Sequence, residues 1–181
     1  MGKVVSVNVA EVRTLERGGR TVRTGLWKQP VQGDVNVHDL GLEGDVQADK
    51  RFHGGNQKAV CAYAREDISW WEAELGRELG PGFFGENLTL SGVDVNGSLV
   101  GERWEVGTAV VEVTEPRTPC WKLATKVGDP GFERRFARAN RPGAYLSVVR
   151  PGVVRAGDAV RLEWTPPDGA PTMARLAPGA A

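Results

Sequence analysis

Short segments in which apolar and polar residues alternate recur along this chain, and glycine-rich turns separate them. Residues 3–9 alternate valine with Ser6 and Asn8, and residues 31–37 repeat the same period of two. Alternation with this period is typical of β-strands that bury one face. Further strands are predicted at residues 58–63, 87–90, 103–106, 108–114, 144–149 and 158–164. Because strand and helix do not alternate regularly, the pattern predicts a mainly β fold, a mostly antiparallel β-barrel with a few packed α-helices.

Three segments are predicted to be helical. Residues 65–79 carry apolar side chains at three- and four-residue spacing, and this helix is expected to stop at Gly80-Pro81-Gly82. Residues 118–127 and 132–140 are also expected to be helices. Between the first two predicted strands, Arg17-Gly18-Gly19-Arg20 predicts a hairpin turn, because paired glycines accept the positive φ angles that tight turns need.

The length and charge of the chain exclude several classes of protein. With 181 residues it fits one domain, predicted at residues 1–164, followed by a flexible tail at residues 165–181 that lacks apolar periodicity. Its 23 basic and 23 acidic residues do not indicate a nucleic-acid or membrane partner. Two distant cysteines, and no signal segment or membrane span, favour a cytoplasmic protein, either a monomer or a homodimer.

Cys120 is the first candidate functional residue, because it lies where a valine-rich strand gives way to a predicted helix. Thr118 is a plausible N-cap and Pro119 suits the first helical position, which would place Cys120 in the first turn. The partial positive charge of the helix terminus, with Arg117 and Lys122 nearby, favours a thiolate that binds a soft metal or carries sulfur. Simple packing of a small apolar residue is the alternative, and it is the interpretation adopted for Cys61 in its predicted strand.

Two basic segments are candidates for binding an anion. Residues 41–58 form a long polar stretch in which Gly54 and Gly55 let backbone amides approach an oxyanion, while Arg51, His53 and Lys58 supply charge or donors. The alternative is an ordinary surface loop. A second cluster lies on and after the last predicted helix, and it either forms a solvated face or holds an anionic cofactor. It consists of Arg134, Arg135, Arg138 and Arg141.

Six ordered motifs resemble the MOSC domain, which is the C-terminal domain of molybdenum cofactor sulfurase, and in particular its YiiM-like branch. The resemblance covers residues 1–163. The motifs are Gly44-Asp45-x-Gln47-Ala48-Asp49, Phe52-His53-Gly54-Gly55, Phe84-Gly85-Glu86-Asn87-Leu88, Pro116-Arg117-x-Pro119-Cys120, Arg141-Pro142-Gly143-Ala144-Tyr145 and Val154-Arg155-Ala156-Gly157-Asp158.

The resemblance implies a barrel of the pyruvate-kinase-like type that binds a pyranopterin molybdenum cofactor. It makes Cys120 the catalytic residue, as molybdenum ligand or sulfur carrier, and a thiolate suits a soft or oxo-thio metal centre. It also places the loop around His53, together with Asn87 and Arg117, in the cofactor pocket and the Arg134 region near the cofactor phosphate. The expected cofactor contacts are Arg51, His53, Gly54, Gly55, Lys58, Asn87, Arg117, Arg134 and Arg135.

Three functions are compatible with this resemblance. The first is a reductase that removes oxygen from N-hydroxylated compounds such as hydroxylaminopurines, with electrons from an external electron-transfer protein, because no flavin or iron–sulfur module is expected in these residues. The second is a sulfur carrier that holds persulfide on Cys120 for cofactor or metal–sulfur cluster assembly and depends on a separate pyridoxal-phosphate cysteine desulfurase. The third is a barrel that has lost its cofactor and acts as a binding protein.

Overall fold

The computed structural model describes residues 1–48 and 54–178. The elements follow one another as β1 (Gly2–Val9), β2 (Arg13–Arg17), β3 (Arg20–Thr24), β4 (Gln29–Val31), β5 (Val35–His38), β6 (Gly41–Leu42), the 3₁₀ turn η1 (Asn56–Lys58), β7 (Val60–Ala64), α1 (Arg65–Leu75), β8 (Leu88–Ser91), β9 (Arg103–Val106), β10 (Ala109–Pro116), α2 (Trp121–Val127), α3 (Phe132–Ala139), β11 (Ala144–Arg150), β12 (Gly152–Val154), β13 (Ala159–Trp164) and α4 (Met173–Leu176).

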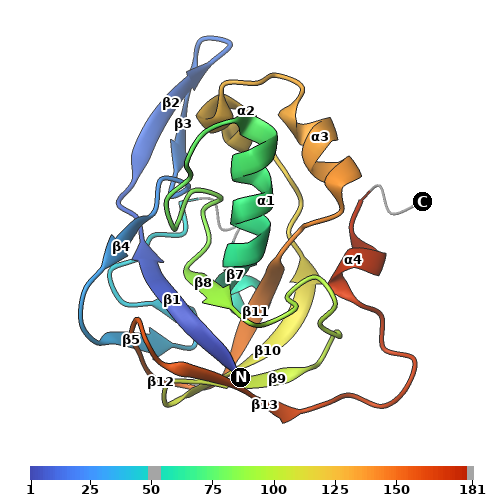
Figure 1. The fold of residues 1–181 in the computed structure, drawn as a ribbon. Helices are drawn as coiled ribbons and strands as arrows, with labels where there is room; N and C mark the ends of the chain where they lie inside the picture. The colour runs from blue at the N-terminus through green and yellow to red at the C-terminus, as the bar shows by residue number, and fades with distance from the viewer. Residues whose placement is uncertain (49–53, 179–181) are drawn as a thin grey trace.

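A closed barrel forms the centre of the described structure (Figure 1). Seven of its strands pair in the order β13-β9-β10-β11-β7-β8-β1, and β1 returns to β13 through the pairs Gly2↔Val160 and Lys3↔Ala159. Strands β7 and β8 run parallel, whereas the other described pairings of the barrel are antiparallel. The predicted mainly β fold, a β-barrel with a few packed helices, is therefore confirmed.

Two apolar clusters stabilise this arrangement. The first fills the barrel with aliphatic side chains and the buried Trp104, as the alternating burial along β1 requires. The second is largely aromatic and lies where α1, α2 and α3 pack beside the barrel, with Trp71 and Phe136 stacked at 5.7 Å between ring centroids. Its polar atoms are paired as well, because the indole of Trp71 donates to the Tyr63 hydroxyl at 3.0 Å. The helices are thereby fixed against the strands that carry the site.

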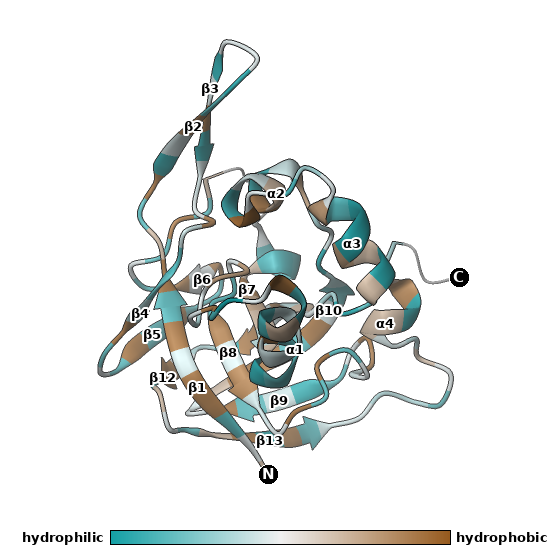
Figure 2. Cartoon of the chain, turned by 45° about the horizontal axis from the view of Figure 1, so that its top comes forward, coloured by the Kyte–Doolittle hydropathy of each residue, from teal (hydrophilic) through white to brown (hydrophobic). Residues whose placement is uncertain are grey.

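The hairpin of β2 and β3 projects away from the barrel (Figure 2). Its turn is the predicted Gly18-Gly19 pair, and both glycines have positive φ angles, of 57° and 72°. Residues in this conformation are strained unless they are glycine, which explains why the chain reverses at this point. The prediction of a hairpin turn is confirmed.

Two predicted elements have different bounds in the structure. The strand expected at residues 31–37 is split into β4, which pairs with β1, and β5, which pairs with β12, because Gly33 adopts a positive φ of 82° between them. The helix expected at residues 65–79 ends at Leu75, where Gly76 takes the left-handed conformation and donates its N–H to the Glu72 carbonyl. At both places a glycine with a positive φ angle ends the element, although the spacing of the apolar residues predicted that it would continue.

The segment predicted to be a flexible tail contains one short helix, and two of its described side chains, Met173 and Ala177, are buried. Thr172 caps α4 by accepting a hydrogen bond from the Arg175 amide at 3.2 Å, and Met173 is fully buried in the cluster that fills the barrel. Leu99 forms a β-bridge with Thr172. The buried Met173 anchors this short helix to the barrel, while the division into a domain at residues 1–164 and a flexible tail at residues 165–181 stays a prediction. Among the described residues, no helix has the length and apolar character needed to cross a membrane.

Candidate functional site

A pocket opens where the segment after β3, the loop after β6, strand β7 and the loop between β10 and α2 meet. It has about 640 Å³ of space between its atoms, counted out to its open mouth. The described residues that line it are Thr24, Gly25, Leu26, Lys28, Asp45, Val46, Gln47, Ala48, Lys58, Ala59, Cys61, Gly85, Asn87, Arg117, Cys120, Lys122 and Tyr145. The pocket therefore contains the candidate Cys120 and three of its expected companions, Lys58, Asn87 and Arg117.

Cys120 lies just before α2 and not in its first turn. The helix begins at Trp121, and Cys120 is the N-cap with an extended backbone (φ −138°, ψ 162°) and no capping hydrogen bond from its side chain. The expected N-cap, Thr118, is wrong by two residues, because Pro119 and Cys120 continue the extended chain that leaves β10. The thiol is free and partly exposed, and it lines both this pocket and the groove outside it.

Arg117 is a buried cation in the wall of this pocket. Its side chain is only 4 % exposed, and its Nη1 has no hydrogen-bond partner among the described residues. None of the ion pairs found in residues 1–48 and 54–178 involves this guanidinium either. Burying a charge without a partner is costly, so such a residue is typical of a site whose partner is a ligand.

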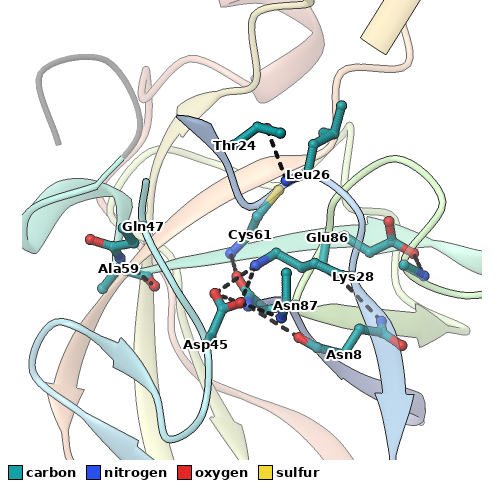
Figure 3. Close-up of polar contacts among 12 residues, drawn as sticks. Asn8, Thr24, Leu26, Lys28, Asp45, Gln47, Ala59, Cys61, Glu86 and Asn87 are labelled. Atoms are coloured by element: carbon teal, nitrogen blue, oxygen red, sulfur yellow. Dashed lines mark hydrogen bonds and ion pairs between the residues drawn. The ribbon is translucent and has the colours of Figure 1, made fainter. Parts of the chain in front are cut away.

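A second buried cation, Lys28, does have a protein partner. Its Nζ lies 2.5 Å from both carboxylate oxygens of Asp45 (Figure 3). Asp45 also accepts hydrogen bonds from the Ala10 amide and from the Asn87 side chain, each at 2.8 Å. Asp45 is the sole acidic residue among the described residues of the pocket wall, and Lys28 neutralises it. The remaining cations of the wall are Lys58, Arg117 and Lys122.

The three remaining cations make the pocket electropositive. Lys58 has a salt bridge to Glu115 at 3.1 Å, but that carboxylate is outside the pocket wall. Lys122 is buried, and its Nζ donates to the Arg23 carbonyl at 3.4 Å, which leaves its charge uncompensated. An anion is the ligand that this balance of charges favours.

Asn87 organises the pocket wall through its own hydrogen bonds. Its Oδ1 accepts from the Cys61 amide at 3.1 Å, while its Nδ2 donates to the Asn8 carbonyl and to Asp45. The side-chain amide therefore fixes β1, β7 and the Asp45 loop relative to one another (Figure 3). This side chain lines the pocket as expected, but its polar atoms are already engaged within the protein.

Cys61, for which the sequence suggested simple packing, is a buried core residue that also lines the pocket. It is 5 % exposed, and its side chain lines the same pocket as Cys120. Burial raises the pKa of the Cys61 thiol to about 11, an effect that the nearby Arg117 charge only partly offsets. Cys61 is therefore a neutral thiol at physiological pH. Burial likewise raises the pKa of the Tyr145 hydroxyl in this wall.

Glu86 and Lys126 hold the segments that border the pocket. Glu86 is fully buried, which raises its pKa, and its Oε1 accepts from the Gly82 amide at 2.6 Å and from the Thr89 hydroxyl at 2.8 Å. Burial lowers the pKa of Lys126 to about 8, and its Nζ donates to the Leu26 and Gly82 carbonyls at 3.2 Å. Both side chains tie residues 82–89 to their neighbours behind the pocket.

Several expected cofactor contacts lie elsewhere. Arg51 and His53 are outside the described residues. Gly54 and Gly55 are next to Gln47, whose Oε1 accepts the Gly55 amide at 3.3 Å, and neither glycine is in the pocket wall. The diglycine thus has a contact within the protein, and its expected contact with an anion stays a prediction.

The arginine cluster on α3 is also away from the pocket wall. Arg134 and Arg135 are exposed, and Arg135 is paired with Asp129 at 3.0 Å. Arg141 contacts the Asp67 carboxylate and lies 4.8 Å from the Trp70 ring centroid. The exposure of Arg134 and Arg135 corresponds to the solvated face that was the alternative interpretation, whereas Arg141 is half-buried and pairs with the buried Asp67. The structure therefore does not bring this cluster to Cys120.

Sequence reasoning did not assign Lys28 or Tyr145 to the pocket wall, although it did place the charge of Lys122 near Cys120. Tyr145 lies within the motif Arg141-Pro142-Gly143-Ala144-Tyr145. Lys28 has no local signal, because its place depends on how the short connection between β3 and β4, residues 25–28, packs against distant segments. Among the described residues, no group of three or more His, Cys, Asp or Glu side chains is arranged to hold a metal ion.

The chain belongs to the MOSC domain family, because the model of that family matches residues 49–161. Within this class it is similar to the YflK protein of Bacillus subtilis, with 38 % identity over 159 residues that cover 88 % of this chain and 72 % of YflK. The crystal structure of YiiM from Geobacillus stearothermophilus is similar over 96 % of this chain and 80 % of that one, with a TM-score of 0.78 and 34 % identity.

A third relative is longer than this chain. It is a protein named reductase from Gibberella moniliformis, which is 30 % identical over 165 residues. The match covers 89 % of this chain but only 29 % of the reductase, so this chain spans less than a third of that protein's length.

Proposed function

We propose that this pocket binds a pyranopterin molybdenum cofactor and that the protein reduces N-hydroxylated compounds with electrons from an external electron-transfer protein. The observation that carries the proposal is the buried, unpaired guanidinium of Arg117 in the wall that also contains Cys120. Membership of the MOSC domain family and the similarity to a protein named reductase support it.

The residues of the pocket suit such a ligand. Arg117 and Lys122 supply uncompensated positive charge for an anionic group such as the cofactor phosphate, and a guanidinium binds phosphate in a bidentate manner. Cys120 offers a partly exposed thiol, which is the donor type that a soft metal prefers. The ion pair of Lys28 with Asp45 keeps the one described carboxylate of the wall from repelling the ligand.

When bound, the cofactor supplies the two-electron redox chemistry that removal of oxygen from an N–OH group requires. The overall reduction consumes two electrons and two protons and releases the amine and water. In this account Cys120 holds the metal end of the cofactor, Arg117 and Lys122 hold its anionic end, and the neutral Cys61 and Tyr145 add no negative charge to the wall.

Sulfur transfer is a second candidate function, because Cys120 is partly exposed and borders the outer groove as well as the pocket. A thiol in this position is accessible to a separate cysteine desulfurase, and persulfide on its sulfur could then reach a ligand in the pocket. The two candidates differ in whether the isolated protein, given electrons, turns over an N-hydroxylated substrate.

The test uses protein produced in a host that makes molybdenum cofactor. Reduction of an N-hydroxylated purine is followed with a reduced viologen dye as the electron donor, for the wild type, Cys120→Ser and Cys61→Ala in parallel. The account predicts turnover for the wild type and Cys61→Ala, and background rates for Cys120→Ser. Full activity of Cys120→Ser would remove that residue from the proposed role, and an inactive metal-loaded wild type that accepts persulfide on Cys120 would favour sulfur transfer.

A further inference from the structure

An open groove continues from Cys120 along the projecting hairpin. It has about 1520 Å³ of space between its atoms, counted out to solvent. Cys120, Lys58 and Lys122 belong to both the pocket and this groove, so a single ligand can extend from one into the other. The other described residues of the groove are Arg17, Gly18, Arg20, Val22, Thr118, Pro119 and Trp121.

The hairpin presents two arginines side by side to this groove. Arg17 and Arg20 are directly opposite each other in the register of β2 and β3, next to the turn. Side chains that are directly opposite in an antiparallel pair lie on the same face, and like charges in such a pair destabilise the hairpin. The arrangement becomes favourable when an anion lies between the two guanidinium groups.

The protein does not supply that anion. Neither Arg17 nor Arg20 has an ion pair within the described chain, although Arg135, Arg155 and Arg161 elsewhere on the surface do. Arg17 instead lies over the ring of Trp121, 4.6 Å from its centroid. The described wall of the groove contains four basic residues and no acidic one. Among the described residues, the two arginines of the hairpin therefore have no acidic partner in the groove wall.

We propose that this groove is a phosphate subsite and that it holds the phosphate of a nucleotide whose other end reaches Cys120. Two facing guanidinium groups match the charge and the bidentate geometry of a phosphate monoester. The nucleotide is either a phosphorylated substrate or a nucleotide extension of the cofactor. Its assignment as a substrate rests on the proposed function, whereas the phosphate subsite rests on the geometry of the groove alone.

Binding to the cofactor-free full-length protein tests the subsite directly. The probes are inosine 5′-monophosphate, inosine and inorganic pyrophosphate, followed by calorimetry and by the fluorescence of the tryptophans, which include Trp121 in the groove. The account predicts that the monophosphate binds at least about 10-fold more tightly than the nucleoside, as the loss of one charge-assisted hydrogen bond would imply. It also predicts that added salt weakens the binding of the monophosphate and of pyrophosphate.

Arg20→Gln and Arg23→Gln form a matched pair of variants, because each removes one charge from an exposed position of the same strand. Arg23 is opposite Thr14 and therefore on the other face of the hairpin, and it is not in the groove wall. Arg20→Gln should reduce monophosphate affinity to that of the nucleoside, while Arg23→Gln should retain it. Equal weakening by both variants, or equal affinity of the wild type for nucleotide and nucleoside, would overturn the proposal.

The source of the phosphate is decided on protein that carries its cofactor. Acid extraction that releases one nucleotide per chain identifies the occupant as part of the cofactor, and extraction without nucleotide identifies it as substrate. Because the binding measurements use cofactor-free protein, they succeed or fail independently of the molybdenum proposal.

Discussion

Arg117 and Lys28 are buried cations in the wall of one pocket, and they differ in whether the protein supplies a partner. Lys28 has the Asp45 carboxylate, whereas Arg117 has no ion pair within the described residues. Removal of one partner of a buried ion pair strongly destabilises a protein. A buried charge that has no partner lowers the stability of the fold even without any substitution. The contrast separates a residue that maintains the structure from one whose charge the described residues leave available to the proposed ligand.

Replacement of these two cations by methionine should therefore have opposite effects on stability. Lys28→Met leaves Asp45 unpaired and should lower the free energy of unfolding by about 3–5 kcal/mol. Arg117→Met should leave the free energy of unfolding of the cofactor-free protein unchanged or raise it. The same substitution should abolish retention of the cofactor. Denaturant unfolding of both variants measures the difference, and strong destabilisation by Arg117→Met would show that Arg117 has a structural role.

Cys61 should make the stability of the protein depend on pH in the alkaline range. The folded state holds the thiol proton up to a pKa of about 11, because the thiol is buried, whereas the unfolded chain releases it near about 8.5. Between these values the unfolded state binds fewer protons, so stability falls as pH rises, by about 1.4 kcal/mol per unit. The free energy of unfolding should be measured for the wild type and for Cys61→Ala between pH 8 and 11. It should fall with pH more steeply in the wild type, by this slope.

Other groups that titrate in this range, such as Tyr63, are shared by the two proteins and cancel in the difference. Parallel curves would mean that the Cys61 thiol is not shielded from water. At neutral pH the Cys61→Ala substitution should cost only about 1 kcal/mol, because it removes one small buried atom.

At the scale of elements, the short helix α4 determines whether the end of the described chain is part of the fold. Met173 is fully buried in the barrel cluster, while Leu176 on the same helix is 46 % exposed. The residues after α4 also border Arg117, since Ala177 and Pro178 line a small space on its far side. The helix therefore anchors a segment that lies close to Arg117.

Met173→Ala should lower the free energy of unfolding by about 2–5 kcal/mol, because it leaves a cavity in a close-packed cluster. Leu176→Ala is the matched control on the same helix and should change stability by less than about 0.5 kcal/mol. Thermal or denaturant unfolding of the two variants provides the comparison. Equal, small effects would mean that the segment is a loosely attached tail, as its composition suggested.

Elements were predictable from the sequence wherever the signal was local. Alternating valines gave the barrel strands, and the Gly18-Gly19 pair gave the hairpin turn. Cys120 was placed correctly between strand and helix but two residues too far into the helix, because Pro119 was taken as the first helical residue. Met173 shows why α4 was missed, since burial of a single side chain against distant strands leaves no periodic pattern.

At the scale of the whole molecule, the site depends on barrel closure, which no local pattern predicts. The order of the strands brings Lys28, Cys61, Asn87 and Arg117 together from four distant segments. Motif resemblance found two of the four. It did not show that Cys61 borders the pocket, because the side of a strand that faces a pocket depends on its neighbours. The position of the Arg134 cluster away from the pocket wall was not predictable either, because the charge of a residue does not determine which part of the fold it faces.

The central claim is that this pocket holds a molybdenum cofactor whose metal depends on Cys120. Molybdenum and pterin per chain, measured on protein from a host that makes the cofactor, test it most directly, with Cys120→Ser as the variant and Cys61→Ala as the control. The account predicts stoichiometric metal and pterin in the wild type and in Cys61→Ala, and loss of the metal in Cys120→Ser. Equal molybdenum in wild type and Cys120→Ser, or loss of the metal from Cys61→Ala alone, would contradict it.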